Sequence, residues 1–408
     1  MLWQGEREEY IQKLEEGEYV PAIALGGSAK ITLFSDDDNP YIYGERLQTN
    51  LGKAFYNLLE ENAENFNSLN TGNLVSSPVT YNVPSSYTAS KAYQEYVKPE
   101  TSEISSALYA FFEYDRPDMY FVDLTKFSVN MGYSLRGGVL SVTLNVSSNS
   151  GTNYLNDSYN SEEGFATLQE ELKVIEEEST KIIEAMPDNL SDFAKVIYFT
   201  DTISDITTYN PASDMQLNYT LYPKAFNMSS VFVYSKYDDS TKYPVCEGYA
   251  EALKYLCDLS GVKCCILTSS SHEWTGIVMG DKIYFADPTW TDNLREAGAR
   301  NASSAYTYMF TKDDSAKEEL HDMSTNGYKD YITQPTVSDT DYLADTGIKN
   351  YTSLDANNDK RITIGDVATE LKAINKGKLS QTYDNNSDGN ADIIDAVIFT
   401  SLMLNGQE

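Results

Sequence analysis

A cysteine, a histidine and an aspartate fall within residues 246–287 and carry the side chains that nucleophilic catalysis needs. Cys246 stands at the start of the run CEGYAEALKYLC, whose apolar residues recur at helical spacing. A lone free cysteine is usually a core residue, but the unpaired N–H groups and the dipole of a helix N-terminus favour a thiolate. An imidazole hydrogen-bonded to a carboxylate can take the thiol proton and later return it to a leaving group. We therefore predict Cys246 as the nucleophile, His272 as the base and Asp287 as the orienting acid.

The strands that must carry His272 and Asp287 are predicted from a hairpin that follows the apolar strand pattern KCCILTS. The dipeptide Gly-Asp at 280–281 separates WTGIVM from KIYFAD and suits a tight two-residue turn with Gly first. In that register Met279 faces Lys282, and His272 lies diagonally from Asp287 on the same face of the sheet. The histidine and the carboxylate are thus expected to meet beside an apolar wall.

Three aromatic residues near this group are candidates for substrate binding: Tyr243, Trp274 and Trp290. Trp290 could line an acyl pocket or anchor the end of a strand, and both alternatives stay open. The N–H of Cys246 is the expected oxyanion donor, with Tyr243 as a candidate partner. The second histidine, His321 in KEELHDM, falls in an acidic helical stretch and is expected to be structural.

The remaining cysteines, Cys257, Cys264 and Cys265, are expected in the core, because they lack the paired CxxC spacing of a metal site. All four cysteines of the chain lie within residues 246–265, so no disulfide framework spans it. They do not reveal the redox compartment.

The segment from about 190 to 325 resembles the transglutaminase-like branch of the papain-like superfamily of cysteine enzymes. The matching stretches are VCEGYA, SHEWTGIV and YFADPTW, and a fainter likeness extends back to about residue 45. The resemblance implies a helix carrying the cysteine that packs on an antiparallel sheet. It also implies acyl transfer from an amide through a thioester, to water or to an amine, with no cofactor for catalysis.

Two loops near the end of the chain, DANNDKRITIGD at 355–366 and DNNSDGNADIID at 384–395, repeat one pattern of oxygen-bearing side chains. Such side chains at positions 1, 3, 5, 9 and 12, with the backbone carbonyl of position 7, can wrap one Ca²⁺. Exit helices are predicted after both loops, whereas the segments that enter them are poor helix formers. The predicted ligands are Asp355, Asn357, Asp359, Arg361, Thr363 and Asp366, then Asp384, Asn386, Asp388, Asn390, Asp392 and Asp395.

This duplicated loop and exit helix resembles a type I dockerin, a module that Ca²⁺ folds and that docks onto a cohesin domain of a scaffoldin. Positions 10 and 11 of the loops are the expected cohesin contacts, here Ile364 with Gly365 and Ile393 with Ile394. Position 6 of the first loop is Lys360, where a sharp turn favours Gly, so the first site is expected to bind Ca²⁺ more weakly.

The composition limits the class of partner. The net charge is −32 with a pI near 4.3, which repels phosphate backbones and anionic lipid, so we expect no nucleic-acid partner. No apolar run is long enough to span a bilayer. The first residues show no signal peptide, yet the abundance of Tyr, Asn, Ser, Thr and Asp is typical of secreted bacterial enzymes of polymer degradation.

The expected fold class is α+β. We predict an N-terminal α/β region at 1–160, a catalytic domain with a transglutaminase-like core at 161–330, a linker at 331–349 and a small all-α calcium-binding dockerin at 350–408.

The predicted function is that of a secreted enzyme of a cellulosome-type complex. It would cleave or transfer peptide and protein amides, as a peptidase or a transglutaminase, and its dockerin would attach it to a cohesin. The alternative is a catalytically silent binding or scaffold component with the same fold. A glycoside hydrolase is less favoured, because no pair of carboxylates stands out.

Overall fold

The computed structural model describes residues 42–210, 223–233, 242–314, 318–327, 332–377 and 381–404. Within these ranges the fold is mixed α+β with antiparallel sheets, which confirms the expected class. Residues 1–41, the larger part of the acidic N-terminal stretch, lie outside the described residues.

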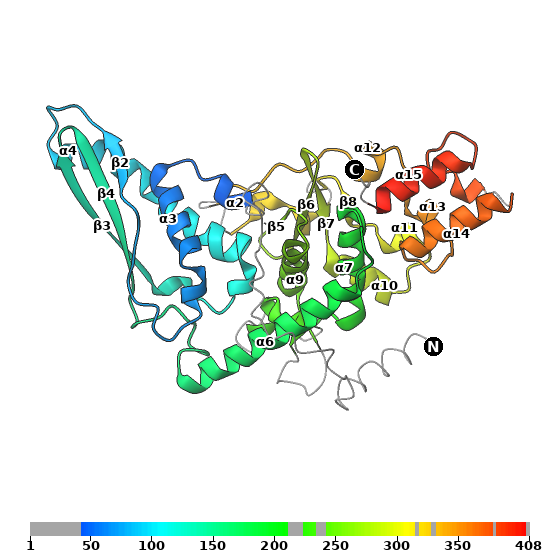
Figure 1. The fold of residues 1–408 in the computed structure, drawn as a ribbon, viewed down its shortest axis with the longest axis horizontal. Coiled ribbons are helices and arrows are strands. Elements are labelled where there is room, and N and C mark those ends of the chain that lie inside the picture. Colours follow the sequence, from blue (N-terminus) through cyan, green and yellow to red (C-terminus); the bar gives the residue numbers. More distant parts are fainter. Residues whose placement is uncertain are drawn as a thin grey trace. The chain divides into compact units, whose positions relative to one another are not determined.

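The N-terminal part combines short helices with one antiparallel sheet (Figure 1). Helix α3 begins after Thr49, whose side chain accepts the Gly52 N–H, and its apolar face is buried. The helical elements are α2 (Ile42–Glu45), α3 (Asn50–Glu61), η1 (Ala63–Phe66), α4 (Ala89–Ala92), η2 (Tyr93–Val97), η3 (Lys98–Glu100), α5 (Ser102–Tyr109), η4 (Ala110–Asp115), η5 (Pro117–Met119) and η6 (Leu124–Lys126).

Strand β4 (Val139–Ser148) is the centre of this sheet. It pairs along its whole length with β3 (Phe127–Arg136), and its other edge pairs with β1 (Leu74–Val75) and β2 (Val79–Asn82). The β3–β4 turn uses Gly137 and Gly138, both at positive φ (57° and 78°), as a tight hairpin turn requires.

A second antiparallel sheet, in the order β5-β6-β7-β8, carries the candidate catalytic residues. Its strands are β5 (Cys264–Thr268), β6 (Glu273–Met279), β7 (Lys282–Ala286) and β8 (Met309–Thr311). Met279 pairs with Lys282 across a turn at Gly280, whose φ is 65°, so the predicted hairpin register is confirmed.

Helices α7 and α9 pack with this sheet in one hydrophobic core. Helix α7 begins after Ser191, whose hydroxyl accepts the Ala194 N–H and so caps the helix. The helical elements of this part are α6 (Glu162–Ala185), α7 (Asp192–Ile206), η7 (Pro223–Phe226), α8 (Ser229–Phe232), α9 (Cys246–Leu259), α10 (Pro288–Glu296), α11 (Ala302–Ala305), η8 (Glu319–His321) and η9 (Met323–Thr325).

The C-terminal tail is helical and packs on the second core. Its elements are α12 (Tyr342–Asp345), α13 (Tyr351–Leu354), α14 (Ile364–Asn375), η10 (Gln381–Tyr383) and α15 (Ile393–Met403). Phe399 and Met403 of α15 are buried in the same hydrophobic cluster as α7 and α9. The backbone N–H of Ser191 donates to the carbonyl of Met403, which ties the end of α15 to the start of α7.

The segment expected to be a linker, 331–349, packs along the sheet in its described residues. Ile332 and Val337 are buried in the N-terminal core cluster, and the Ser338 N–H donates to the Ile283 carbonyl at 2.8 Å. The periodicity fails here because the segment is held as an irregular strap and forms no regular element until α12.

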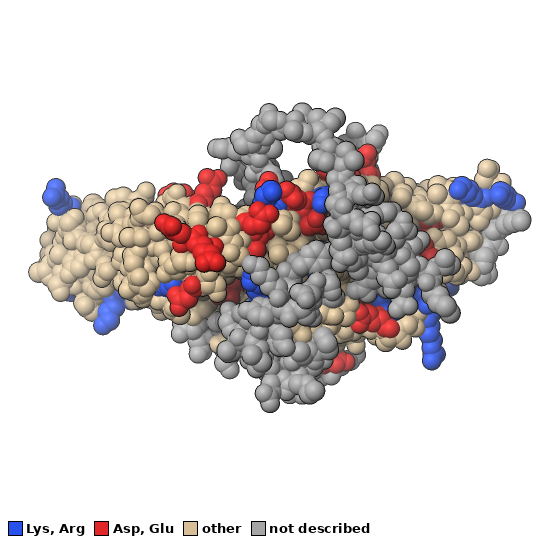
Figure 2. All heavy atoms as spheres, turned by 90° about the horizontal axis from the view of Figure 1, so that it is seen from below, with Lys and Arg blue, Asp and Glu red and all other residues tan. Residues whose placement is uncertain are grey.

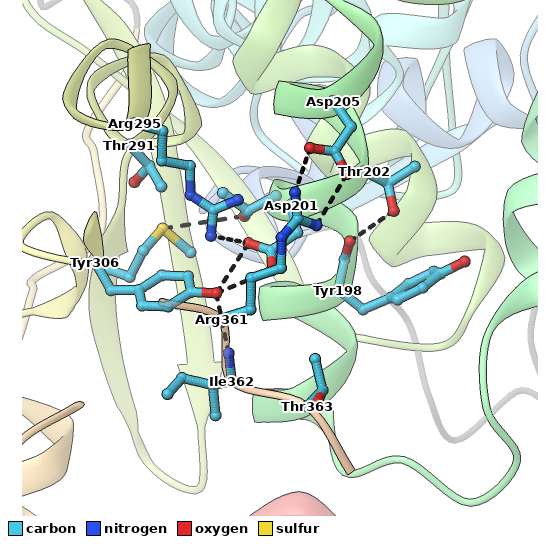
Figure 3. Close-up of polar contacts among 12 residues, drawn as sticks. Tyr198, Asp201, Thr202, Asp205, Thr291, Arg295, Tyr306, Arg361, Ile362 and Thr363 are labelled. Carbon is cyan, nitrogen blue, oxygen red and sulfur yellow. Dashed lines mark hydrogen bonds and ion pairs between the residues drawn. The ribbon is translucent and has the colours of Figure 1, made fainter. Parts of the chain in front are cut away.

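A polar network joins the tail to α7, α10 and the residues after α11 (Figure 3). The guanidinium of Arg361 makes two hydrogen bonds to Asp205 of α7, at 2.6 and 2.9 Å. Next to this pair, Asp201 accepts hydrogen bonds from Arg295 and from the Tyr306 hydroxyl. The first predicted calcium loop is thus attached to α7, which packs against α9.

Acidic side chains form several exposed groups on the face drawn in Figure 2, whereas Lys and Arg are more scattered. This distribution agrees with the net charge of −32 and with weak attraction for polyanions. Among the described helices, none has the length and apolar character required to cross a lipid bilayer.

Candidate functional site

Cys246 is the first residue of α9, as predicted. The helix buries Tyr249, Leu253 and Leu256 against the core, and this packing fixes the position of the first turn, which carries Cys246. The free thiol is buried. The backbone N–H of Glu273, the residue after His272, lies close enough to the thiol to oppose its high pKa, so the sulfur lies beside the start of β6.

His272 and Asp287 meet in the arrangement that the hairpin predicts. The Nε2 atom of His272 lies 2.7 Å from Oδ2 of Asp287, and both side chains are buried. Asp287 is also the N-cap of α10, and its Oδ1 accepts the Trp290 N–H at 2.9 Å. Because Nε2 is engaged by the carboxylate, Nδ1 is the ring nitrogen left to exchange a proton with a thiol.

The ionisation of Cys246 differs from the expectation based on the helix N-terminus. Burial raises the pKa of this thiol, and the Glu273 N–H only partly opposes the effect. The negative charges of Glu247, Glu273 and Asp287 raise the pKa further. The resting sulfur is therefore a neutral thiol that needs His272 as a base, because desolvation outweighs the helix dipole here.

An acidic group surrounds the start of α9. Burial, followed by the charge of Glu113, raises the pKa of Glu247 to about 8. Burial and the neighbouring carboxylates raise the pKa of Glu251 and of Glu273 well above the usual range. Near neutral pH Glu247 is therefore largely protonated, and its negative charge beside Cys246 develops only as the pH rises.

The aromatic candidates divide into two groups. The rings of Trp274 and Trp290 both stack on the imidazole of His272, with centroid distances of 5.7 and 5.4 Å. Trp274 is fully buried, and its indole N–H has no hydrogen-bond partner among the described residues. The two tryptophans therefore form one group, which lies in the site itself. Tyr243 is half-buried just before α9, and nothing places its hydroxyl at the thiol.

His321 also lies in this site, although the sequence suggested a structural role. Its Nε2 is 3.1 Å from Oδ2 of Asp287, and its Nδ1 is 2.8 Å from Oδ1 of Asp314. The sequence signal that could have found it is scarcity, because the chain contains only two histidines. Its distance along the chain from Asp287 and its acidic surroundings hid this contact.

The same three residues have the composition of a metal site. Ligand atoms of His272, Asp287 and His321 all lie within 4.8 Å of one another, and two imidazoles with a carboxylate can bind a transition metal. These atoms are already paired with one another at hydrogen-bond distances. A metal would have to replace both hydrogen bonds to Asp287.

Comparison of the chain with protein-family models and with curated proteins finds no match.

The two predicted calcium loops fold alike. In each loop the position-3 N–H donates to the position-12 carboxylate, as Asn357 does to Asp366 and Asn386 to Asp395. The position-6 N–H donates to the position-1 carboxylate in both loops. The position-5 oxygen accepts the position-7 N–H, and the position-12 oxygen accepts the position-9 N–H. The same hydrogen bonds thus hold the backbone of both loops in one arrangement.

Position 6 of both loops has the left-handed backbone conformation, in agreement with the sharp turn predicted there. Lys360 has a φ of 71° and Gly389 a φ of 90°. A side chain at this conformation is strained, whereas glycine adopts it freely. In the second loop, Oδ1 of Asp384 is buried with no hydrogen-bond partner among the described residues, as a ligand awaiting a cation would be.

The side chains expected to contact a cohesin differ between the repeats. Ile393 and Ile394 of α15 are 54% and 52% exposed, and Val397 on the same helix is 56% exposed. In the first repeat Ile364 packs partly against the core, and only Gly365 is exposed. A large exposed apolar surface is therefore found on the second repeat.

Proposed function

We propose that the chain is a cysteine enzyme that acts on peptide or protein amide bonds through a thioester. The observation that carries this proposal is the buried His272–Asp287 pair, 2.7 Å apart, together with the contact of the Cys246 thiol, at the start of α9, with the backbone N–H of Glu273, the residue after His272. A buried imidazole oriented by a carboxylate beside a thiol matches what general-base activation of a nucleophile requires.

In the proposed reaction, Nδ1 of His272 removes the Cys246 proton as the sulfur forms a bond to the substrate carbonyl carbon. The C–N bond then breaks, and the imidazolium gives the proton to the leaving amine, so a thioester and a free amine result. In the second half, His272 takes a proton from water or from another amine as it attacks the thioester carbonyl carbon, the C–S bond breaks, and the imidazolium gives this proton to the sulfur. Asp287 orients the ring through Nε2.

The transglutaminase-like resemblance is supported at the level of arrangement. Helix α9 packs against β5 and β6 of an antiparallel sheet, and β6 and β7 carry His272 and Asp287 at their ends. The geometry is compatible with hydrolysis and with amine transfer, because both use the same thioester and differ in how water is excluded. We therefore propose a peptidase or a transglutaminase.

The tail is proposed to be a dockerin-like module with two Ca²⁺ sites. The first would use Asp355, Asn357, Asp359, the Arg361 carbonyl, Thr363 and Asp366, and the second the equivalent residues from Asp384 to Asp395. Oxygen-only ligands fit this hard cation, and the bound ion would supply the positive charge that holds the loop carboxylates together. The exposed Ile393, Ile394 and Val397 support docking of a cohesin on α15, which would place a secreted enzyme on an extracellular scaffold.

The proposed chemistry is tested with the full chain and Cys246→Ala on a casein-type substrate, with and without a primary amine, followed by mass spectrometry. Shortened fragments from the wild type alone indicate a peptidase, and a gain of the amine mass indicates transfer. Identical, unchanged substrate in both samples would instead support a silent binding protein.

The proposed tail function is tested by calorimetric titration of the calcium-depleted chain with Ca²⁺. We expect two sites, of which the second is tighter because Gly389 fits its turn. Absence of binding heat at several temperatures, together with an unchanged melting temperature, would remove the dockerin proposal.

A further inference from the structure

His321 lies between two carboxylates in the candidate active site. Its side chain is 1% exposed, with Nε2 at 3.1 Å from Asp287 and Nδ1 at 2.8 Å from Asp314. The oxygen of Asp287 that it contacts is Oδ2, the same atom that Nε2 of His272 contacts at 2.7 Å.

These contacts define the protonation state of the ring. A neutral imidazole has one N–H, and an ionised carboxylate only accepts hydrogen bonds. Both nitrogens of His321 face carboxylates, so both must carry a proton for each contact to be a hydrogen bond. Burial alone would lower the pKa of His321, but the hydrogen bonds to Asp287 and Asp314 raise it to about 9.

The ring is also fixed in orientation. Trp290 stacks on it with centroids 4.4 Å apart, and Trp274 lies 4.7 Å away. The rings of Tyr308 and Phe285 lie in edge-to-face arrangements with it, with centroids 6.1 and 5.4 Å away. The described titratable groups that face the ring are therefore Asp287, Asp314, Tyr308 and the stacked His272.

A positively charged His321 ring at this place stabilises the ionised carboxylate of Asp287. Burial alone would raise the pKa of Asp287, but the two histidines lower it to about 2. Its carboxylate then accepts three hydrogen bonds, from His272, His321 and the Trp290 N–H, so its orientation is fixed. The charge of His321 also offsets the negative charge of Asp287 in this buried site.

We propose that His321 is a positioning residue of the active site, a fixed imidazolium that orients Asp287, the carboxylate that holds His272, and compensates its charge. This inference rests on the proposed function for its role in the reaction. The contacts and the protonation state are properties of the resting protein and can be measured without any substrate.

The direct test is NMR of the histidine ring nitrogens in the tag-free full chain, which has only two histidines. His321→Gln removes one set of signals and thereby assigns both. We expect both nitrogens of His321 to be protonated at pH 7.5 and to lose a proton near pH 9. In Asp314→Asn, which keeps the contact to Asp287, the midpoint should fall by about one unit or more. A singly protonated His321 at pH 7.5 in the wild type would overturn the proposal.

The second test is the pH profile of kcat/KM with whichever amide substrate is turned over. His321→Gln removes a positive charge from beside Asp287. The apparent pKa values of both limbs of the pH profile should therefore rise by about one unit. A purely structural role would lower activity without moving the limbs, which would contradict the inference, and circular dichroism checks the fold of the variant. If the chain turns over no amide, the proposed function fails, and the NMR result still decides the state of His321.

Discussion

The side chain of Arg361 attaches the first of the two proposed calcium loops to α7, so its removal should destabilise the part that carries the candidate active site as well as the tail. The guanidinium makes two charge-assisted hydrogen bonds to Asp205, at 2.6 and 2.9 Å, with the two side chains 31% and 35% exposed (Figure 3). An exposed ion pair contributes about 0–1 kcal/mol, and a hydrogen bond to a charged group about 1.5–3 kcal/mol when well buried. For this half-buried pair we expect Arg361→Gln to cost about 1–2 kcal/mol of unfolding free energy.

The substitution leaves the calcium ligand in place, because position 7 of the loop supplies its backbone carbonyl. Asn390 occupies the same position in the second loop, with an exposed side chain, so Asn390→Gln is the matched control. Both variants should bind Ca²⁺ as the wild type does in calorimetry. A difference in stability between them then reports the contact with Asp205.

The assay is urea unfolding in saturating Ca²⁺, followed by tryptophan fluorescence. Residues 350–408 contain no tryptophan, whereas Trp274 and Trp290 lie in the candidate active site. With the third tryptophan, Trp3, replaced by Phe in every variant, the probe reports the candidate catalytic part while the substitution is in the tail. We expect the transition of Arg361→Gln to move to lower urea and that of Asn390→Gln to stay. An unchanged tryptophan transition in Arg361→Gln would refute the coupling.

Three further predictions concern the core shared with α15, the turn at Lys360 and the contacts of His321. Chelation of Ca²⁺ should lower the tryptophan-monitored melting temperature, because Phe399 shares a core with α7 and α9; an effect confined to tail probes would contradict this. Lys360→Gly should raise stability by about 1 kcal/mol and tighten the first site in calorimetry, because it removes a non-glycine residue at a φ of 71°. The stability difference between wild type and His321→Gln should be largest below pH 6.5 and shrink by about 3 kcal/mol as the pH rises through 9, because the folded-state pKa is raised. A pH-independent difference in urea unfolding would show that the ring contributes only packing.

Local patterns were sufficient to predict the elements that carry the site. The Gly-Asp turn set the register of Met279 with Lys282 and brought His272 to Asp287. The duplicated loops predicted short exit helices, and the poor helix formers before them form only α13 and a 3₁₀ turn. These features depend on turn chemistry and spacing within a few residues, which a single sequence displays.

Long-range packing could not be predicted in the same way. His321 meets Asp287 only because a 3₁₀ turn after β8 folds back over the hairpin. The strap at 332–349 looks like a linker because its buried residues, such as Ile332 and Val337, have no periodicity. The state of the Cys246 thiol was misjudged for a related reason, since burial depends on what covers the helix start and not on the helix itself.

The central claim, that His272 activates Cys246, is tested most directly by the rate and site of iodoacetamide alkylation at pH 7, measured by peptide mass spectrometry. We predict modification of Cys246 ahead of Cys257, Cys264 and Cys265, which are fully buried, and a rate at least about tenfold lower in His272→Gln. Equal rates in wild type and His272→Gln, or equal labelling of the other cysteines in the folded protein, would contradict the account.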